Sequence, residues 1–269
     1  MLTEEEFFGD PSKVALMKRG YHLWSLLGEN PRFAYYGRLL ALCDPGEDTA
    51  DILIHLAGLQ GAAVCYFYPK KDAEALFREL GDAGLCIDRH EHFWGGQAAL
   101  AASREALLAY RLPNDLNIVT IDAKTPIEIL ADVARLCDGC GVMPVPGSVM
   151  RGGVIKGVCV VAIDKDGRAV ATASSYMLHH PLSSRSKDAF WGMLATREDR
   201  RGEKISLLLG AQVILYMWER YGARGFMTGV RADNHPSKAL CNKLGVIDSD
   251  WIFAQAINER VLGGSSITK

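Results

Sequence analysis

The sequence lacks a strong excess of either charge. Its 269 residues contain 30 lysine and arginine side chains and 32 aspartate and glutamate side chains, which leaves a formal net charge of −2 with histidine neutral. Nucleic acids and anionic membranes attract extended positive charge, so neither is an expected partner. Charged residues make up 23% and hydrophobic residues 49% of the chain. These fractions are ordinary for a folded protein, so long disordered regions are not expected.

The sequence also lacks the long apolar runs that membrane spans and export signals require. Its most apolar long stretch, residues 205–218, is interrupted by Ser206, Gly210 and Gln212 and is shorter than the ~18 apolar residues of a membrane span. The first residues are acidic, whereas a secretory signal begins with basic residues. We therefore expect no transmembrane helix, no export and a cytoplasmic location.

A disulfide framework is not expected either, because the cysteines are odd in number and scattered through apolar sequence. The seven are Cys43, Cys65, Cys86, Cys137, Cys140, Cys159 and Cys241. The C-x-x-C pair at 137 and 140 has no second ligand pair, so two packed thiols are favoured over a redox pair, and no zinc site is expected.

His90 and His92 would share one face of a strand, but no third ligand is identifiable. A solvated edge is favoured there over a metal site.

Charge and turn residues divide the chain near Pro113. Residues 1–112 carry a net charge of −5 and residues 113–269 a net charge of +3, and the short polar stretch 111–115 lies between them. Polar, proline-bearing stretches of this kind often separate domains. We predict a smaller α/β domain of unknown role at residues 1–112, followed by a second domain at residues 113–269.

Hydrophobic periodicity predicts an α/β (α+β) fold in both units. In the first unit it predicts strands at 62–68 and 85–87 around a helix at 73–80. In the second unit, Asp166-Gly167 marks a tight hairpin turn between two strands. The elements predicted for the second unit are strand 116–121, a helix opening at Thr125-Pro126, strands 157–163, 169–177 and 189–196, helix 205–217, strand 225–230, a short helix near Pro236 and strand 251–257.

The junction between strand 189–196 and the following helix is the most informative segment. It reads Leu194-Ala-Thr-Arg-Glu-Asp-Arg-Arg-Gly-Glu-Lys-Ile-Ser206. A loop that enters a helix exposes the first backbone N–H groups at the positive end of the helix dipole, and phosphate is a natural ligand for such a site. Arg200, Arg201 and Lys204 add positive charge, most of which the neighbouring acidic residues offset.

This segment resembles the central motif of the GCN5-related N-acetyltransferase (GNAT) superfamily, Arg-Gly-x-Gly-x-Gly or Ala. Here the motif reads Arg201-Gly202-Glu203-Lys204-Ile205-Ser206. The next family motif has its counterpart in Asn234-His-Pro-Ser237-Lys-Ala-Leu-Cys241-Asn-Lys-Leu-Gly245-Val246. The resemblance covers about residues 115–260 and leaves residues 1–112 unrecognised. It implies a twisted, mostly antiparallel mixed sheet flanked by helices.

The resemblance also implies that acetyl-CoA, or another acyl-CoA, lies in a V-shaped gap between the strand ending at Thr196 and the strand ending at Val230. It implies no metal. Backbone groups of the first strand would bind the pantetheine arm, the loop amides would bind the pyrophosphate, and the second motif would bind near the pantetheine. The residues so assigned are Leu194, Ala195, Thr196, Arg201, Gly202, Glu203, Lys204, Ile205, Ser206, Asn234 and Ser237.

The sequence departs from the family pattern at the positions most relevant to catalysis. Lys204 replaces the middle glycine, Ser206 replaces the final small residue, and Cys241 replaces a tyrosine that protonates the departing thiolate in many relatives. Cys241 is therefore either the acid or a packed thiol. The base candidates just before strand 189–196 are Asp188, His179 and His180. Trp191 and Tyr176 fit an acceptor pocket and a core equally well.

The leading interpretation is an N-acetyltransferase that moves an acetyl group from acetyl-CoA to a primary amine by direct attack in a ternary complex. The acceptor, a small molecule or a peptide, is not identified by the sequence. The alternative is a non-catalytic acyl-CoA-binding or regulatory protein, motivated by the three departures. An interaction protein that docks a partner through Phe7, Phe8 and residues 32–36 is a third reading. The first unit would shape the acceptor site or form a subunit contact, and a homodimer is compatible with the latter.

Overall fold

The computed structural model describes residues 6–264 and residue 267. Within that part of the chain, ten strands form one sheet in the order β1-β2-β3-β10-β4-β9-β8-β7-β6-β5. The strands are β1 (Phe33–Ala34), β2 (Ala41–Leu42), β3 (Ala62–Pro69), β4 (Cys86–Gly95), β5 (Asn117–Thr120), β6 (Gly157–Ile163), β7 (Ala169–Met177), β8 (Asp188–Thr196), β9 (Gly225–Val230) and β10 (Ile247–Ile257).

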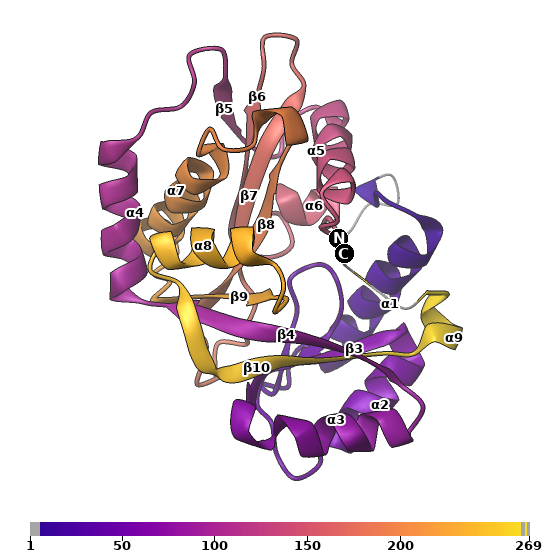
Figure 1. The fold of residues 1–269 in the computed structure, drawn as a ribbon. Helices are drawn as coiled ribbons and strands as arrows, with labels where there is room; N and C mark the ends of the chain where they lie inside the picture. The colour runs from indigo at the N-terminus through magenta and orange to yellow at the C-terminus, as the bar shows by residue number, and fades with distance from the viewer. Residues whose placement is uncertain (1–5, 265–266, 268–269) are drawn as a thin grey trace.

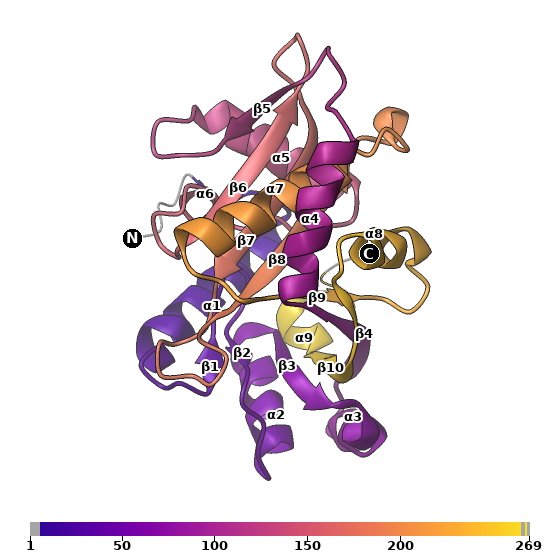
Figure 2. The ribbon, with the colours of Figure 1, turned by 90° about the vertical axis from the view of Figure 1, so that its left-hand side faces the viewer.

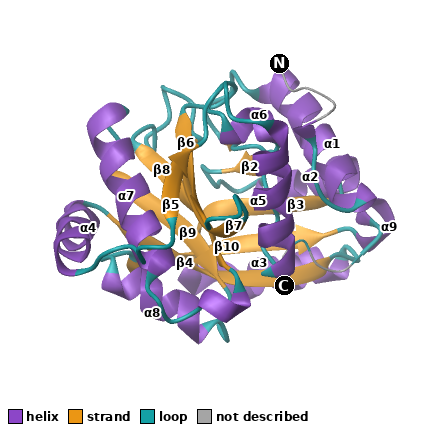
Figure 3. Cartoon of the chain, turned by 90° about the horizontal axis from the view of Figure 1, so that it is seen from above, coloured by secondary structure: helices purple, strands orange, loops and turns teal. Residues whose placement is uncertain are grey.

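Helices cover both faces of this sheet. Figure 3 shows α4 and α7 on one side of the sheet and α1 and α5 on the other. The helices are α1 (Pro11–Leu27), α2 (Thr49–Gln60), α3 (Ala73–Asp82), α4 (Gln97–Ala109), α5 (Ile127–Gly139), α6 (Gly147–Met150), α7 (Ile205–Arg220), α8 (His235–Lys243) and α9 (Glu259–Leu262), with short 3₁₀ helices η2 (Lys70–Asp72) and η3 (Glu198–Arg200). No helix in the described ranges is long and apolar enough to cross a membrane.

The sheet is mixed, mostly antiparallel and strongly twisted. The pairs β2–β3 and β8–β9 are parallel, and the other neighbouring pairs are antiparallel. In Figure 1, β6, β7 and β8 run up the molecule, whereas β3, β4 and β10 run across its lower half. The predicted fold class is confirmed.

The β6–β7 hairpin forms at the predicted Asp-Gly turn. Gly167 has φ +76°, a value that glycine adopts without steric cost. The Asp164 carboxylate accepts hydrogen bonds from the backbone N–H groups of Asp166 and Arg168, at 3.1 and 3.0 Å. The strands on either side have the bounds that the hydrophobic pattern predicts, because both the turn and the pairing are local in sequence.

Strand β4 joins the two halves of the chain. It is longer than the predicted strand at 85–87, and it lies between β10 and β9. The sheet therefore continues past the predicted boundary at residues 112 and 113, which falls between α4 and β5; the division into two domains stays a prediction. The expected solvated edge at His90 and His92 is wrong. Their side chains are buried, because β4 has a neighbouring strand on each side and packed residues over it.

The core draws on both halves of the chain. Leu16 and Leu53 belong to the same buried cluster as Leu130 and Ile257. A second cluster lies between β6–β9 and the helices α4 and α7, which pack side by side (Figure 2). Helices α1, α2 and α4 were not predicted from the sequence.

Five aromatic residues answer open questions from the sequence. Trp191 and Tyr176 are fully buried within the core. Phe7 and Phe8 are half-buried and pack against the first cluster. Tyr36 is also buried, so an exposed aromatic docking surface at these positions is a wrong expectation.

Candidate functional site

The strands β8 and β9 separate to form a cavity. Over the described residues, they pair at Asp188–Phe190 with Gly225–Met227 and then diverge. Figure 1 shows β8 running upward and β9 running across the molecule. A cavity of about 700 Å³ is lined by residues 192–196 of β8 and by residues 228–231 at the end of β9. The V-shaped gap predicted between these strands is present.

A β-bulge bends β8 where the strand borders this gap. Its pairing with β7 shifts register between Gly192 and Ala195, and Met193 has φ +51°. A bulge leaves one residue out of the ladder and bends the strand. Because β9 has already diverged, backbone groups on this edge of β8 lack a β9 partner among the described residues. They are available to a ligand in the cavity.

The N-terminus of α7 opens into the same cavity. Residues 204–207 line the cavity, and no described side chain caps the helix. The first N–H groups of a helix have no partner within it, so an uncapped N-terminus attracts anions. The preceding loop turns through left-handed conformations at Gly202, with φ +88°, and at Lys204, with φ +61°. The second value explains a glycine in the family motif, since a side chain there costs about 1–2 kcal/mol.

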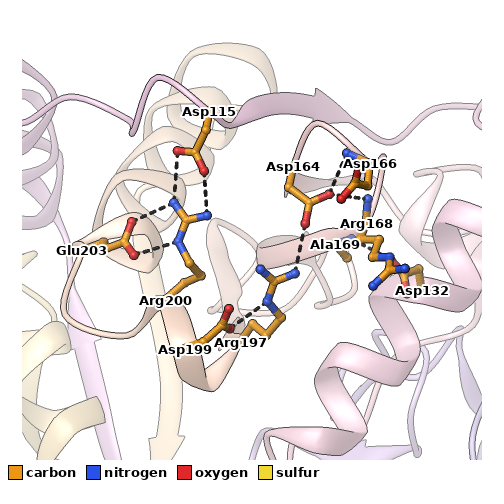
Figure 4. A network of polar contacts seen from close by, with 10 residues as sticks. All are labelled: Asp115, Asp132, Asp164, Asp166, Arg168, Ala169, Arg197, Asp199, Arg200 and Glu203. Atoms are coloured by element: carbon orange, nitrogen blue, oxygen red, sulfur yellow. Dashed lines mark hydrogen bonds and ion pairs between the residues drawn. The ribbon is translucent and has the colours of Figure 1, made fainter.

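The charged side chains around this loop are mostly engaged with one another (Figure 4). Arg200 binds Asp115 at 2.9 and 3.2 Å and Glu203 at 2.7 and 2.8 Å. The hydrogen bonds from Arg200 lower the pKa of both carboxyl groups. The Lys204 ammonium lies 3.8 Å from the centroid of the Tyr110 ring.

Arg201 is the least engaged cation of the loop. Its guanidinium is 3.9 Å from Glu198, and more than half of the side chain is exposed. Thus Arg201 is free to bind an anion at the α7 N-terminus. The Ser206 hydroxyl contacts the Thr196 hydroxyl and so joins α7 to the end of β8.

The second predicted motif forms the wall contributed by α8. Asn234 accepts a hydrogen bond from the Ser237 backbone N–H at 3.1 Å and caps this helix, and both residues line the cavity. Cys241 also lines it. Burial raises the pKa of the Cys241 thiol to about 12. Transfer of its proton to a thiolate of ordinary pKa, ~8.5, is therefore uphill.

Three predicted site residues lie elsewhere. The described cavity-lining residues do not include Asp188, His180 or Glu203. Asp188 is buried at the start of β8, 3.7 Å from Arg185, and burial raises the pKa of its carboxyl group. His180 Nδ1 accepts a hydrogen bond from the Leu182 backbone N–H at 3.1 Å. The Glu203 side chain is turned toward Arg200.

The two cysteines of the C-x-x-C pair differ in their surroundings. All seven cysteines are free, and Cys137 is buried in α5. The Cys140 thiol donates a hydrogen bond to the Thr196 carbonyl at 3.3 Å, beside the cavity. Cys137 is packed as predicted, whereas Cys140 is half-buried at the cavity, so the preference for two packed thiols over a redox pair stays a prediction. Among the described residues, no group of three or more His, Cys, Asp or Glu is placed to hold a metal ion.

The opposite wall comes largely from the N-terminal unit, for which the sequence left open a role in the acceptor site or in a subunit contact without naming any residue of this wall. Tyr36, Arg38, Val64, Tyr66 and His90 line the cavity. The Tyr36 ring stacks on Phe190 of β8, with ring centroids 4.0 Å apart. The only sequence feature that could have indicated this wall is Arg38, an arginine within an apolar, aromatic run.

His90 sits in a small polar cluster at this wall. Its Nδ1 is 3.8 Å from a carboxylate oxygen of Asp88. That carboxylate also binds Arg231 at 2.9 Å and Gln255 at 2.7 Å. Burial lowers the pKa of His90 from its ordinary value of 6.5 despite the nearby carboxylate. The imidazole is therefore neutral at pH 7 and able to accept a proton.

Comparison with known proteins identifies one family in this region. Residues 154–246 match the model of the Acetyltransferase (GNAT) family. The matched segment runs from just before β6 to just after α8 and contains the β8–α7 loop. The predicted resemblance is confirmed over these residues. No curated protein matches the chain significantly.

Solved structures resemble the fold over most of the chain. A GCN5-related N-acetyltransferase from Kribbella flavida has a TM-score of 0.56 at 14% identity, covering 91% of this chain and 95% of that one. A tandem GNAT protein from the clavulanic acid biosynthesis pathway has a TM-score of 0.54 at 14% identity, with 81% and 74% covered. A GCN5-related N-acetyltransferase-like protein from Streptococcus suis has a TM-score of 0.51 at 21% identity, with 83% and 81% covered. At these identities the likeness concerns the fold alone.

Proposed function

From the GNAT-family domain at residues 154–246, we propose that the protein is an N-acetyltransferase that transfers an acetyl group from acetyl-CoA to a primary amine. The observation that carries the proposal is the uncapped N-terminus of α7, which opens into the cavity between the diverging strands β8 and β9. An anionic, elongated ligand is suited to that combination, because phosphates bind helix N-termini and an amide-bearing arm binds a free strand edge.

The residues around the cavity fit acetyl-CoA in chemical type. Backbone groups of Leu194, Ala195 and Thr196 would bind the amide-bearing arm. The loop would bind phosphate through its backbone N–H groups and the Arg201 side chain. The loop and α8 residues proposed for the cofactor, all of which line the cavity, are Arg201, Gly202, Lys204, Ile205, Ser206, Asn234 and Ser237.

In this proposal His90 is the general base. Acetyl-CoA supplies a thioester; the new C–N bond forms as the C–S bond breaks, and the amine must lose a proton to be a nucleophile. The neutral imidazole of His90 takes that proton, and Asp88 orients the ring. Cys241 remains the candidate acid beside the cavity, although a pKa of about 12 makes it a weak one. A thiolate leaves without strict need of an acid, since thiols ionise near pH ~8.5.

Calorimetric titration with acetyl-CoA and acetyl-pantetheine, which lacks the phosphates, tests the cofactor site. We expect Arg201→Glu to weaken acetyl-CoA binding by about 10- to 100-fold, because it removes a cation and places a carboxylate beside the phosphates. Acetyl-pantetheine should bind weakly to both proteins. Arg220→Glu makes the same charge change at the other end of α7 and should leave the affinity unchanged. Equal affinity of wild type and Arg201→Glu would remove the phosphate site from the loop.

A non-catalytic acyl-CoA-binding protein is the second candidate. The buried thiol of Cys241 and the strained Lys204 stand where the family motif has a tyrosine and a glycine. Tight binding of acetyl-CoA without release of free thiol, across a panel of amines, would favour this candidate over the transferase.

A further inference from the structure

The charges that line the cavity have one sign. Among the lining residues that the structure describes, none is aspartate or glutamate, and the fully charged ones are all basic: Arg38, Arg200, Arg201, Lys204, Arg231 and Lys243. The buried carboxylate of Asp88 is not among the lining residues, and Arg231 and Gln255 bind it. A polycationic acceptor would therefore find no anionic partner along the described wall.

Arg38 is the basic residue that the fold leaves least compensated. Its side chain is nearly buried, with 8% of the residue exposed. One Nη donates to the Tyr36 hydroxyl at 3.3 Å, and the other donates to the Met143 carbonyl. Among the described residues, Nε has no hydrogen-bond partner, and no carboxylate forms an ion pair with this guanidinium. A buried cation without a counterion is costly, so a bound anion would stabilise it strongly.

The position of Arg38 separates it from the phosphate site. Its guanidinium lies over the rings of Tyr36 and Phe190, at 5.4 and 5.6 Å from their centroids. Phe190 is six residues before Thr196 on β8, where β8 still pairs with β9, and the bulge at Met193 lies between the two residues. A cofactor whose phosphates sit at the α7 N-terminus would leave Arg38 for a second molecule at the far end of the cavity.

Aromatic side chains surround this end of the cavity. Tyr36 stacks on Phe190, and Tyr66 packs against Phe253 with ring centroids 4.8 Å apart. All four residues line the cavity. Such a wall suits an apolar body, while the planar fork of one arginine suits a single carboxylate.

We infer that the acceptor is an amine that also carries a carboxylate on an apolar body, as an aromatic amino acid does, and that Arg38 binds this carboxylate. The substrate class rests on the proposed transferase function. The presence of a carboxylate site at Arg38 does not. Polyamines and aminoglycosides are excluded as preferred acceptors by the same charge arrangement.

Binding of an aromatic carboxylate tests the site without any turnover. Titration calorimetry would compare 3-phenylpropionate with 3-phenylpropanamide, which has the same shape without the charge. We expect the carboxylate to bind the wild type at least tenfold more tightly, Arg38→Met to abolish the difference, and Arg38→Lys to keep part of it. Arg185→Met is the matched control, because Arg185 also stacks on aromatic rings, those of Phe67 and Trp251, but does not line the cavity. Equal binding of the two ligands to the wild type would overturn the inference.

Turnover tests the substrate class. Thiol release from acetyl-CoA would be measured with L-phenylalanine, phenethylamine and spermidine. We expect kcat/KM for L-phenylalanine to exceed that for phenethylamine by about 10- to 100-fold in the wild type, and the ratio to fall to near one in Arg38→Met. Preference for spermidine or phenethylamine would overturn the inference while leaving the transferase intact. Failure of acetyl-CoA to bind or react would overturn the transferase, while the carboxylate titration still decides the role of Arg38.

Discussion

The two ends of the cavity are built in different ways. The end proposed to bind phosphate, called the phosphate end below, comes from one continuous segment, residues 194–207, in which a strand, a loop and a helix N-terminus follow one another. The acceptor end joins segments that are far apart in sequence: Arg38 follows β1, Tyr66 lies on β3, His90 lies on β4, and Phe253 lies on β10. The phosphate end presents backbone groups and an exposed arginine, whereas the acceptor end presents buried side chains.

In the proposed function, the two ends of the cavity have different tasks: one binds the cofactor, and the other recognises the acceptor and accepts its proton. Binding through backbone N–H groups depends on local geometry, which tolerates a change of side chain such as lysine for glycine at 204. In the proposed function, recognition and proton transfer depend on Arg38 and His90, two side chains that are held by packing and lie outside the family match at residues 154–246. Substitutions at the acceptor end should therefore affect chemistry and specificity, while those at the phosphate end should affect affinity and local stability.

The sharpest test of this separation is His90→Gln. We expect kcat to fall by about 100- to 10 000-fold, the usual contribution of a general base, with little change in acetyl-CoA affinity. Thiol-release kinetics and calorimetry would measure the two effects. His22→Gln, at an exposed position on α1, is the control. Unchanged kcat in His90→Gln would mean that His90 is not the general base.

Acid should loosen the acceptor end before the phosphate end. His92 and His179 contact the Phe67 ring near Arg185, and burial lowers the pKa of each to about 3. Their unfolded pKa is about 6.5, so below that pH the unfolded chain binds more protons and the free energy of unfolding falls, by up to about 1.4 kcal/mol per pH unit for each histidine.

The carboxylates at the phosphate end respond at lower pH. Arg200 lowers the pKa of Asp115 and Glu203, so these carboxyl groups stay ionised and paired to a lower pH than free ones. Urea unfolding between pH 4 and 7 would measure the dependence, and His179→Leu should roughly halve the slope. A flat stability profile over this range would contradict the assignment of the two histidines.

Cys241→Ala should have a small effect. The thiol lines the cavity, but with a pKa of about 12 it gives up its proton poorly. We expect kcat to fall less than about tenfold, as measured by thiol release at saturating acetyl-CoA. A loss of 100-fold or more would make Cys241 a catalytic acid and would place part of the chemistry on the family-matched side of the cavity.

The smallest expected effect tests the backbone of the phosphate end. Because Lys204 has φ +61°, Lys204→Gly should be more stable than Lys204→Ala by about 1 kcal/mol in urea unfolding. Both variants lose the contact of the ammonium with Tyr110, so the difference between their free energies of unfolding measures the cost of the left-handed backbone at residue 204. Equal stability would mean that the loop relaxes in solution to another conformation.

Local patterns predicted much of the second half of the chain. The bounds of β6, β7 and β9 coincide with the predicted strands, and α7 begins at the predicted residue. Turn chemistry and periodicity act over a few residues, so they are visible in the sequence. The helices α1, α2 and α4 were missed because their burial comes from packing against distant strands and helices rather than from a clear local stripe.

The candidate site also has one part that the sequence predicted and one part that it did not. The sequence alone predicted the loop of the proposed phosphate site, with Arg201 and Gly202, because one strand-to-helix junction contains them all. Only the tertiary structure decided the acceptor end. Insertion of β4 between β9 and β10 buries His90 beside Asp88, and the stacking of Tyr36 on Phe190 places Arg38 at the same cavity. The pairing of His90 with Phe253 and the stacking of Tyr36 on Phe190 each join residues more than a hundred positions apart, a proximity that packing creates and no local pattern records.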